Sequence, residues 1–141
     1  MLPKDEAEHL TRVLRLGSGD TVAIFDGRGH EFLAKVLAAE ARDVRVQLLS
    51  RVEPATEATV PLTLVQAVLK GDKMDDVVRD AVMLGVFAIQ PLITTRTEVT
   101  VAALVRGGRV DRWRRVAIAS VKQSRRAVVP GTKLSGVSSD R

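Results

Sequence analysis

The pattern of apolar and polar positions changes near residue 60 and predicts a different structure on each side. Before that point, Ala7, Leu10 and Leu14 fall near helical spacing, and alternating segments typical of half-buried strands follow. The expected strands are 21–25, 30–38 and 43–52. Three antiparallel strands form a small sheet or barrel, and closing a barrel would require a further strand, which we expect upstream of Met1.

The second half alternates apolar strands with amphipathic helices. Residues 62–69 form an apolar run, as in a strand that is covered on both faces. Apolar side chains at i, i+3 and i+4 predict helices over 74–84 and 109–124, with a strand over 87–93 between them. Asp72 is the expected N-cap of the first helix, and Gly85 is its expected C′ residue. This order predicts a parallel α/β sheet.

The segment between the halves reads as a linker, because residues 53–59 hold few large apolar side chains and include Pro54. We therefore expect a small β domain over 1–53 with an incomplete N-terminus, a linker over 54–61 and an α/β unit over 62–141.

Composition excludes several classes of protein. The chain has no cysteine and two histidines, which removes disulfides and thiolate catalysis and makes a metal site improbable. Nothing at the N-terminus resembles a signal peptide, and no apolar run approaches the roughly 18 residues of a membrane helix. We therefore expect a cytoplasmic protein with no membrane association and no metal.

Positive charge is concentrated at the end of the chain. The net charge is +5, but residues 103–141 hold ten Lys and Arg against two Asp, which leaves −3 for the rest. Such a segment attracts polyanions, although a solvated helix face gives the same pattern. Aromatic content of 3% offers no stacking platform for bases, and no helix-turn-helix spacing supports a DNA-binding domain.

Two cationic turns follow the strands of the second half. Lys70 and Lys73 flank the start of a helix, where backbone N–H groups suit an anion, although an ordinary solvated turn is the simpler interpretation. Arg96 follows the second strand at its carboxyl end, the edge at which open α/β sheets bind ligands. A surface ion pair between Arg96 and Glu98 explains its presence equally well.

Two helical segments add further candidates. Gln123, Ser124 and Arg126 lie at the end of the second long helix, where cations are favoured by the helix dipole whatever the function. Arg12 and Arg15 lie on the first short helix, as either a phosphate-contacting edge or a solvated face.

These segments together resemble a known family. Residues 9–16, 19–20 and 25–29 are similar to the N-terminal PUA-like domain of the RsmE family, the 16S ribosomal RNA uridine-N3 methyltransferases. Residues 66–74, 81–85, 91–96 and 113–130 resemble the opening of its catalytic SPOUT domain. The resemblance implies a PUA-like small β-barrel followed by the first part of a SPOUT-type parallel α/β sheet. It also implies S-adenosylmethionine as the cofactor, 16S rRNA or the small ribosomal subunit as partner, and a homodimer for the complete family member.

The resemblance also suggests roles for the candidate residues. Arg96 would be catalytic, because a cation stabilises the negative charge that develops when uracil N3 loses its proton. The expected RNA-binding residues are Arg12, Arg15, Lys70, Lys73, Gln123, Ser124 and Arg126.

Three departures from the family pattern qualify this prediction. The family's glutamate-arginine-serine run is replaced by Thr95-Arg96-Thr97, and the glycine after Lys-Gln-Ser is replaced by Arg125. The glycine-rich knot segment, which in this family binds S-adenosylmethionine and forms the dimer, does not occur. We therefore expect these 141 residues alone to lack the cofactor site and to be inactive. The alternative is a non-catalytic RNA-binding module.

Overall fold

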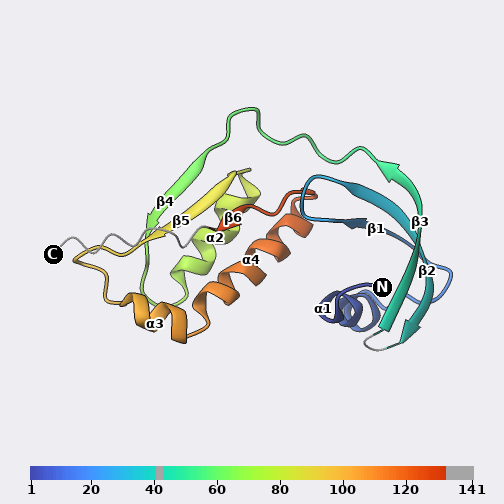
Figure 1. The fold of residues 1–141 in the computed structure, drawn as a ribbon, viewed down its shortest axis with the longest axis horizontal. Coiled ribbons are helices and arrows are strands. Elements are labelled where there is room, and N and C mark those ends of the chain that lie inside the picture. The colour runs from blue at the N-terminus through green and yellow to red at the C-terminus, as the bar shows by residue number, and fades with distance from the viewer. Residues whose placement is uncertain (41–42, 133–141) are drawn as a thin grey trace. The chain divides into compact units, whose positions relative to one another are not determined.

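The protein divides between Pro54 and Ala55 into two compact units (Figure 1). The structure is a computed structural model, and it describes residues 1–40 and 43–132.

The first unit combines a short helical segment with an antiparallel sheet. Helix α1 (Lys4–Glu8) continues into one turn of π-helix, η1 (His9–Val13). Strands β1 (Thr21–Phe25), β2 (Glu31–Glu40) and β3 (Asp43–Val52) pair in the order β1-β2-β3. The three strands predicted from the alternating pattern are confirmed, with ends that differ by at most two residues.

The core of the first unit lies between the helical segment and the adjoining part of the sheet. Ala7 and Leu10 pack with Val36 and Val44, and all four side chains are buried. Leu48, on the same strand as Val44, is 55% exposed, because the packed cluster does not extend that far along β3. The strand pattern therefore predicted the strands correctly but overestimated how much of the sheet is covered.

The turn between β1 and β2 is fixed by one aspartate. Asp26 accepts hydrogen bonds from the backbone N–H groups of Arg28 at 2.7 Å and His30 at 3.1 Å. Its second carboxylate oxygen lies 2.7 Å from Nδ1 of His30. The side-chain bond with His30, followed by the backbone bond from Arg28, lowers the pKa of Asp26 from 3.8 to about 2. The carboxylate therefore stays ionised and holds this turn at any ordinary pH.

The second unit is a parallel α/β arrangement. Its strands are β4 (Thr63–Ala67), β5 (Ala88–Leu92) and β6 (Gly131–Thr132), paired in the order β4-β5-β6. Its helices are α2 (Lys73–Met83), α3 (Val101–Arg106) and α4 (Arg109–Gln123). Sequence patterning missed α3, although Thr100 caps it by accepting a hydrogen bond from the N–H of Ala103 at 3.2 Å.

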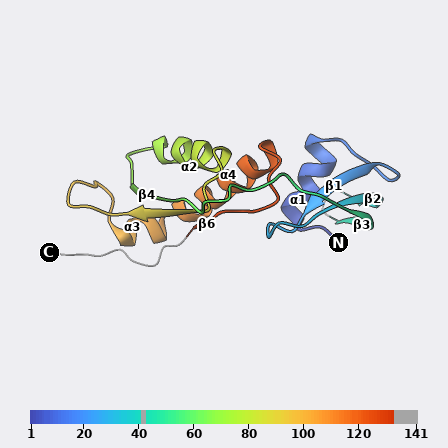
Figure 2. The same cartoon turned by 90° about the horizontal axis from the view of Figure 1, so that it is seen from above.

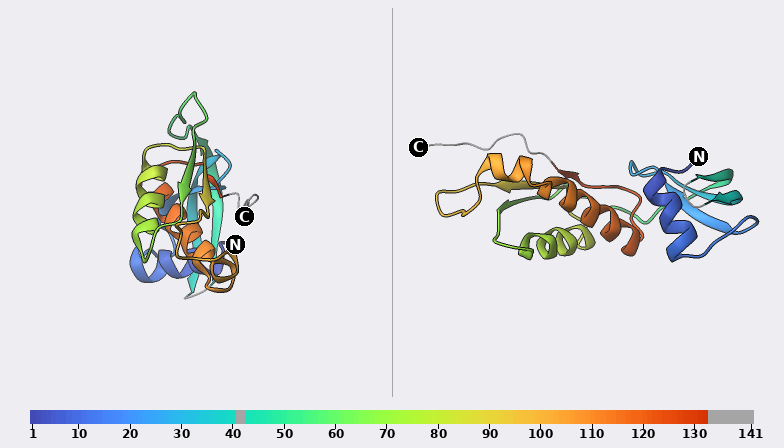
Figure 3. Two further views of the ribbon diagram at one scale, coloured as in Figure 1. Left: turned by 90° about the vertical axis from the view of Figure 1, so that its left-hand side faces the viewer. Right: turned by 90° about the horizontal axis from the view of Figure 1, so that it is seen from below.

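Helices α2 and α4 pack side by side through the predicted apolar stripes. Met74, Val78 and Val82 of α2 are buried, as are Trp113 and Val121 of α4. The two helices remain adjacent when the molecule is turned (Figure 2) and from two further sides (Figure 3). Lys73 is the first residue of α2 and Gln123 is the last residue of α4. The packing of the two helices therefore determines where these candidate residues lie.

Both long helices end in the same hydrogen-bonded motif, in which a left-handed residue follows the helix. At the end of α2, the N–H groups of Gly85 and Val86 donate to the carbonyls of Val82 and Ala81. At the end of α4, Arg125 and Arg126 donate in the same way to the carbonyls of Lys122 and Val121. Gly85 has φ +91°, as expected for a C′ glycine, whereas Arg125 adopts φ +56° with a side chain. The structure therefore explains why glycine suits this position and shows that arginine is strained there.

Candidate nucleic-acid interface

Two polar loops meet at the carboxyl edge of the parallel sheet. One loop follows β4, carries Lys70 and leads into α2 at Lys73, and the other follows β5 and carries Arg96. The pair Lys70 and Glu98 joins the loops, with Nζ and Oε2 3.0 Å apart. Both side chains are well exposed, so this pair is a surface ion pair worth at most about 1 kcal/mol, and Lys70 can exchange its partner for a phosphate.

The start of α2 is occupied by carboxylates. Asp72 precedes the helix as predicted, but its side chain makes no capping hydrogen bond. It pairs instead with Arg112 of α4 at 3.2 Å, and Asp75 pairs with the same guanidinium at 2.6 Å. Because these carboxylates repel an anion at the helix N-terminus, a phosphate would have to be held by lysine side chains. Lys73 is exposed and has no hydrogen-bond or ion-pair partner among the described residues.

Arg96 lies at the tip of a hydrogen-bonded turn. The N–H of Thr97 donates to the carbonyl of Thr94 at 3.0 Å, and the N–H of Thr94 donates to Oγ1 of Thr97 at 2.9 Å. The side chain of Arg96 is exposed, and within 1–40 and 43–132 it has no ion pair. The pair with Glu98 that the sequence left open is formed by Lys70 instead. Arg96 therefore presents an unpaired cation on an ordered turn.

The candidate residues at the end of α4 differ in their exposure and in their hydrogen bonds. Gln123 is exposed, while the Ser124 hydroxyl donates to the carbonyl of Ser120 at 2.8 Å. Arg126 is only 8% exposed. Its guanidinium donates to the carboxylate of Glu57 at 2.5 Å and to the carbonyls of Val82 and Val86 at 2.7 and 3.1 Å. These bonds hold Arg126 inside the unit and away from a surface ligand.

No local sequence pattern indicates the contact between Arg126 and Glu57. The two residues are 69 positions apart, and Glu57 lies in the segment interpreted as a linker. The side chain of Glu57 is 31% exposed, so the ion pair is largely removed from water. Residue 57 is therefore an anchored part of the second unit.

The candidate residues of the second unit form two separate groups. Arg112, in the first turns of α4, contacts the start of α2, and Arg126 contacts the end of α2, so the two helices run in the same direction. The 11 residues of α2 span about 16 Å. Lys70, Lys73 and Arg96 thus lie near one end of this helix pair, and Gln123 to Arg126 lie near the other.

The two arginines of the first unit also differ from each other. Arg12 forms an i,i+4 ion pair with Glu8. Arg15 is exposed and, in the described part of the chain, has no ion pair or hydrogen bond from its side chain. It adopts φ +55°, which is unfavourable for a residue with a side chain.

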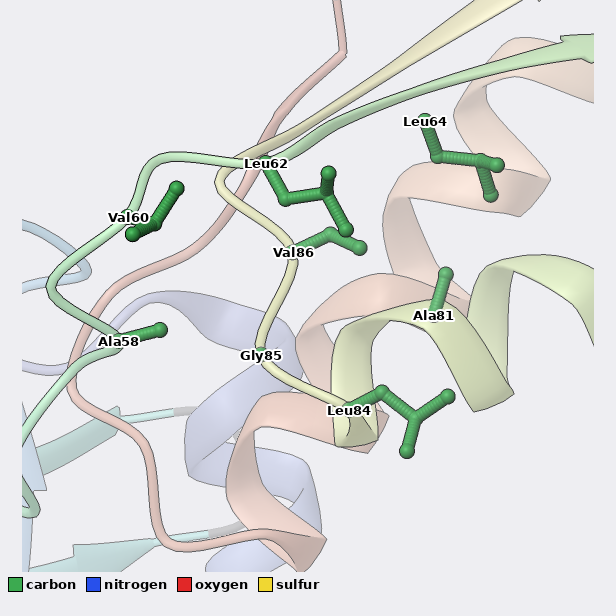
Figure 4. Close-up of a pocket in the computed structure, with 8 residues that line it drawn as sticks. All are labelled: Ala58, Val60, Leu62, Leu64, Ala81, Leu84, Gly85 and Val86. Atoms are coloured by element: carbon green, nitrogen blue, oxygen red, sulfur yellow. The ribbon is translucent and has the colours of Figure 1, made fainter.

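An apolar hollow of about 440 Å³ lies at the amino-terminal side of the parallel sheet. Its lining residues are Ala58, Val60, Leu62, Leu64, Ala81, Leu84, Gly85 and Val86. Figure 4 shows the side chains of Leu62 and Val86 pointing toward one another. None of these side chains carries a polar group.

Among the described residues, no three His, Asp or Glu side chains are arranged to hold a metal ion. No helix in the same part of the chain is long and apolar enough to cross a membrane.

Models of two protein domains match the chain in order. Residues 2–49 match an RNA methyltransferase PUA domain, and residues 56–135 match an RNA methyltransferase domain. Two curated proteins that are similar to this chain are both ribosomal RNA small subunit methyltransferases E. The protein of Buchnera aphidicola is 26% identical over 92% of this chain and 52% of its own length. That of Synechocystis is 32% identical over 89% of this chain and 39% of its own.

Solved structures of methyltransferases are also similar to this chain. The ribosomal RNA small subunit methyltransferase E of Neisseria gonorrhoeae, bound to S-adenosyl methionine, matches with a TM-score of 0.87 and 32% identity. A putative methyltransferase of Legionella pneumophila in complex with the same cofactor also has a TM-score of 0.87, with 29% identity. Each covers 94% of this chain, while this chain covers 54% and 55% of them. The chain therefore spans about half the length of these relatives.

Proposed function

This chain belongs to the RNA methyltransferase family, in its RsmE branch, and we propose on that premise that the protein containing it methylates N3 of a uridine in 16S ribosomal RNA. The observation that supports this most is the match of both units, in order, to one two-domain family. S-adenosylmethionine would supply the methyl group as an electrophilic sulfonium.

The described residues do not fit that cofactor. S-adenosylmethionine carries an adenine, a carboxylate and an ammonium, each of which needs polar partners in a buried site. The hollow at the amino-terminal side of the sheet is lined by apolar residues throughout and offers no polar side chain. We therefore propose that the methyl donor binds outside the described residues.

Arg96 is the proposed catalytic residue. Removing the N3 proton leaves negative charge on the uracil ring, and a positioned cation lowers the energy of that state. Arg96 suits this task because its guanidinium is unpaired, within the described residues, and its turn is fixed by the bonds between Thr94 and Thr97. Lys70 and Lys73, beside it at the same sheet edge, would hold RNA phosphates.

The RNA-binding set is revised by the geometry at the end of α4. Arg12, Arg15, Lys70, Lys73 and Gln123 are accessible and stay in the proposal. Ser124 donates its hydroxyl proton to its own helix and can only accept a further bond from RNA. Arg126 we assign to positioning the chain, because its guanidinium is bonded to Glu57, Val82 and Val86.

Replacing Arg12 and Arg15 together with alanine should weaken binding to a 16S rRNA transcript roughly tenfold, because two phosphate contacts are lost. The slope of log affinity against log salt should fall by about 1.4 to 1.8. Fluorescence anisotropy over a range of KCl concentrations measures both quantities. Lys35→Ala with Arg45→Ala removes the same charge from the sheet of the same unit and is the matched control. Equal affinity in the test variant and in wild type would remove Arg12 and Arg15 from the interface.

The competing proposal is a non-catalytic RNA-binding module or an inactive fragment. For a polypeptide of residues 1–141, we expect titration calorimetry with S-adenosylmethionine to give no saturable heat, because the described residues form no fitting site. Micromolar binding would show that the cofactor site is present after all. Sedimentation of the whole protein would test the homodimer that we propose for it.

A further inference from the structure

Positive φ angles single out two arginines in this chain. Among the described residues, the left-handed region holds six glycines and only two residues with side chains, Arg15 and Arg125. A side chain is unfavourable in this conformation, and glycine at either position would avoid the cost. Both exceptions are long, cationic and exposed.

No interaction of the Arg125 side chain with the described residues of its own unit offsets the cost of its positive φ. Its backbone N–H completes the end of α4, but any residue except proline would donate that bond. Its side chain makes no hydrogen bond or ion pair with the described residues. Cations are favoured near helix C-termini, but a cationic residue inside the last turn gives the same benefit without a positive φ. The helix dipole therefore does not explain an arginine at position 125.

The neighbouring arginines extend the same positive surface. Arg114 and Arg115 on α4 are exposed, and in the parts of the chain that are described neither has an ion-pair partner. The helix rises about 12 Å from Arg115 to its last residue, Gln123, and Arg125 lies just beyond that end, so several consecutive phosphates of one strand could lie along this surface. Arg112 and Arg126 do not extend this surface, because both are bonded to residues of this unit.

We propose that Arg125 is an RNA phosphate-binding residue, and that with Arg114 and Arg115 it forms an RNA contact on α4 distinct from the sheet-edge group Lys70, Lys73 and Arg96. This inference rests on the proposed function, since it assumes an RNA substrate. A guanidinium binds a phosphate through two parallel hydrogen bonds, which a lysine or glycine cannot reproduce.

The substitution Arg125→Gly tests this proposal, because its expected effects on protein stability and on RNA affinity have opposite signs. Relief of backbone strain should raise the stability of the protein and increase its thermal midpoint by a few degrees. Loss of the guanidinium should weaken binding to a 16S rRNA transcript roughly fivefold and reduce the salt slope by about 0.7 to 0.9. Arg125→Lys keeps the charge and the strain, so it should lose less affinity and gain no stability. Arg79→Ala removes an exposed arginine that pairs with Asp76 and Asp80, and it should leave RNA affinity unchanged.

A more stable Arg125→Gly variant with wild-type RNA affinity and salt slope would overturn the inference. That result differs from failure of the proposed function, in which the unaltered protein itself binds no RNA. Inorganic phosphate at millimolar concentration should compete only weakly, because the contact depends on several linked phosphates.

Discussion

Arg96→Ala should lower the rate constant for methyl transfer about 100-fold in the whole protein while changing the KM for RNA little. The physical reason is that a cation beside the uracil acts mainly on the charge that develops as N3 loses its proton, and less on the neutral base that first binds. Transfer of labelled methyl groups to small ribosomal subunits from cells lacking the modification measures both constants.

Two comparison variants sharpen this result. Arg96→Lys should recover part of the rate, because a cation remains without the planar guanidinium. Arg106→Ala removes an exposed arginine of the same unit whose Nε donates to the carbonyl of Ala102, and it should retain full activity. A fall in RNA affinity alone, with an unchanged rate constant, would show that Arg96 only binds substrate.

Glu57→Ala should lower the free energy of unfolding by about 3 kcal/mol, since it leaves the guanidinium of Arg126 buried without its counter-charge. The effect should exceed that of removing Glu98, Asp76 or Asp80, because the ion pairs of those carboxylates are exposed on both sides. Urea unfolding followed by circular dichroism measures it.

The exposed ion pair of Lys70 and Glu98 supplies the matched control. Glu98→Ala removes one carboxylate from a surface pair and should cost less than about 1 kcal/mol. Replacing Glu57 and Arg126 together with apolar residues should cost less than the sum of the single changes, because the single changes share one interaction. Equal costs for Glu57→Ala and Glu98→Ala would mean that the buried pair adds no more to stability than a surface pair.

Local patterning predicted most of the elements, because their signals lie within a few residues. The stripe at Met74, Val78 and Val82 fixes α2, and the stripe at Trp113 and Val121 fixes α4. Helix α3 was missed because its six residues carry too few apolar repeats, although Thr100 and Gly107 mark its two ends. A helix this short shows no clear periodic pattern of apolar residues, so only its capping residues could have indicated it.

The grouping of the candidate residues could not be predicted in the same way. The sequence suggested RNA-binding roles for Lys70 and for the end of α4 without placing them, and the parallel run of α2 and α4 puts them at opposite ends of the helix pair. Whether Arg126 faces water depends on Glu57, 69 positions away. Long-range pairing of this kind has no signature in a local pattern, since both residues are common at surfaces.

The position of the methyl group on the RNA tests the central claim most directly. Small ribosomal subunits that lack the modification would be incubated with S-adenosylmethionine and the whole protein that contains this chain, and the 16S rRNA would then be digested to nucleosides for mass spectrometry. The account predicts 3-methyluridine, at one residue per subunit. Binding of the RNA without any methylated nucleoside, or a methyl group on the ribose or on another base, would contradict it.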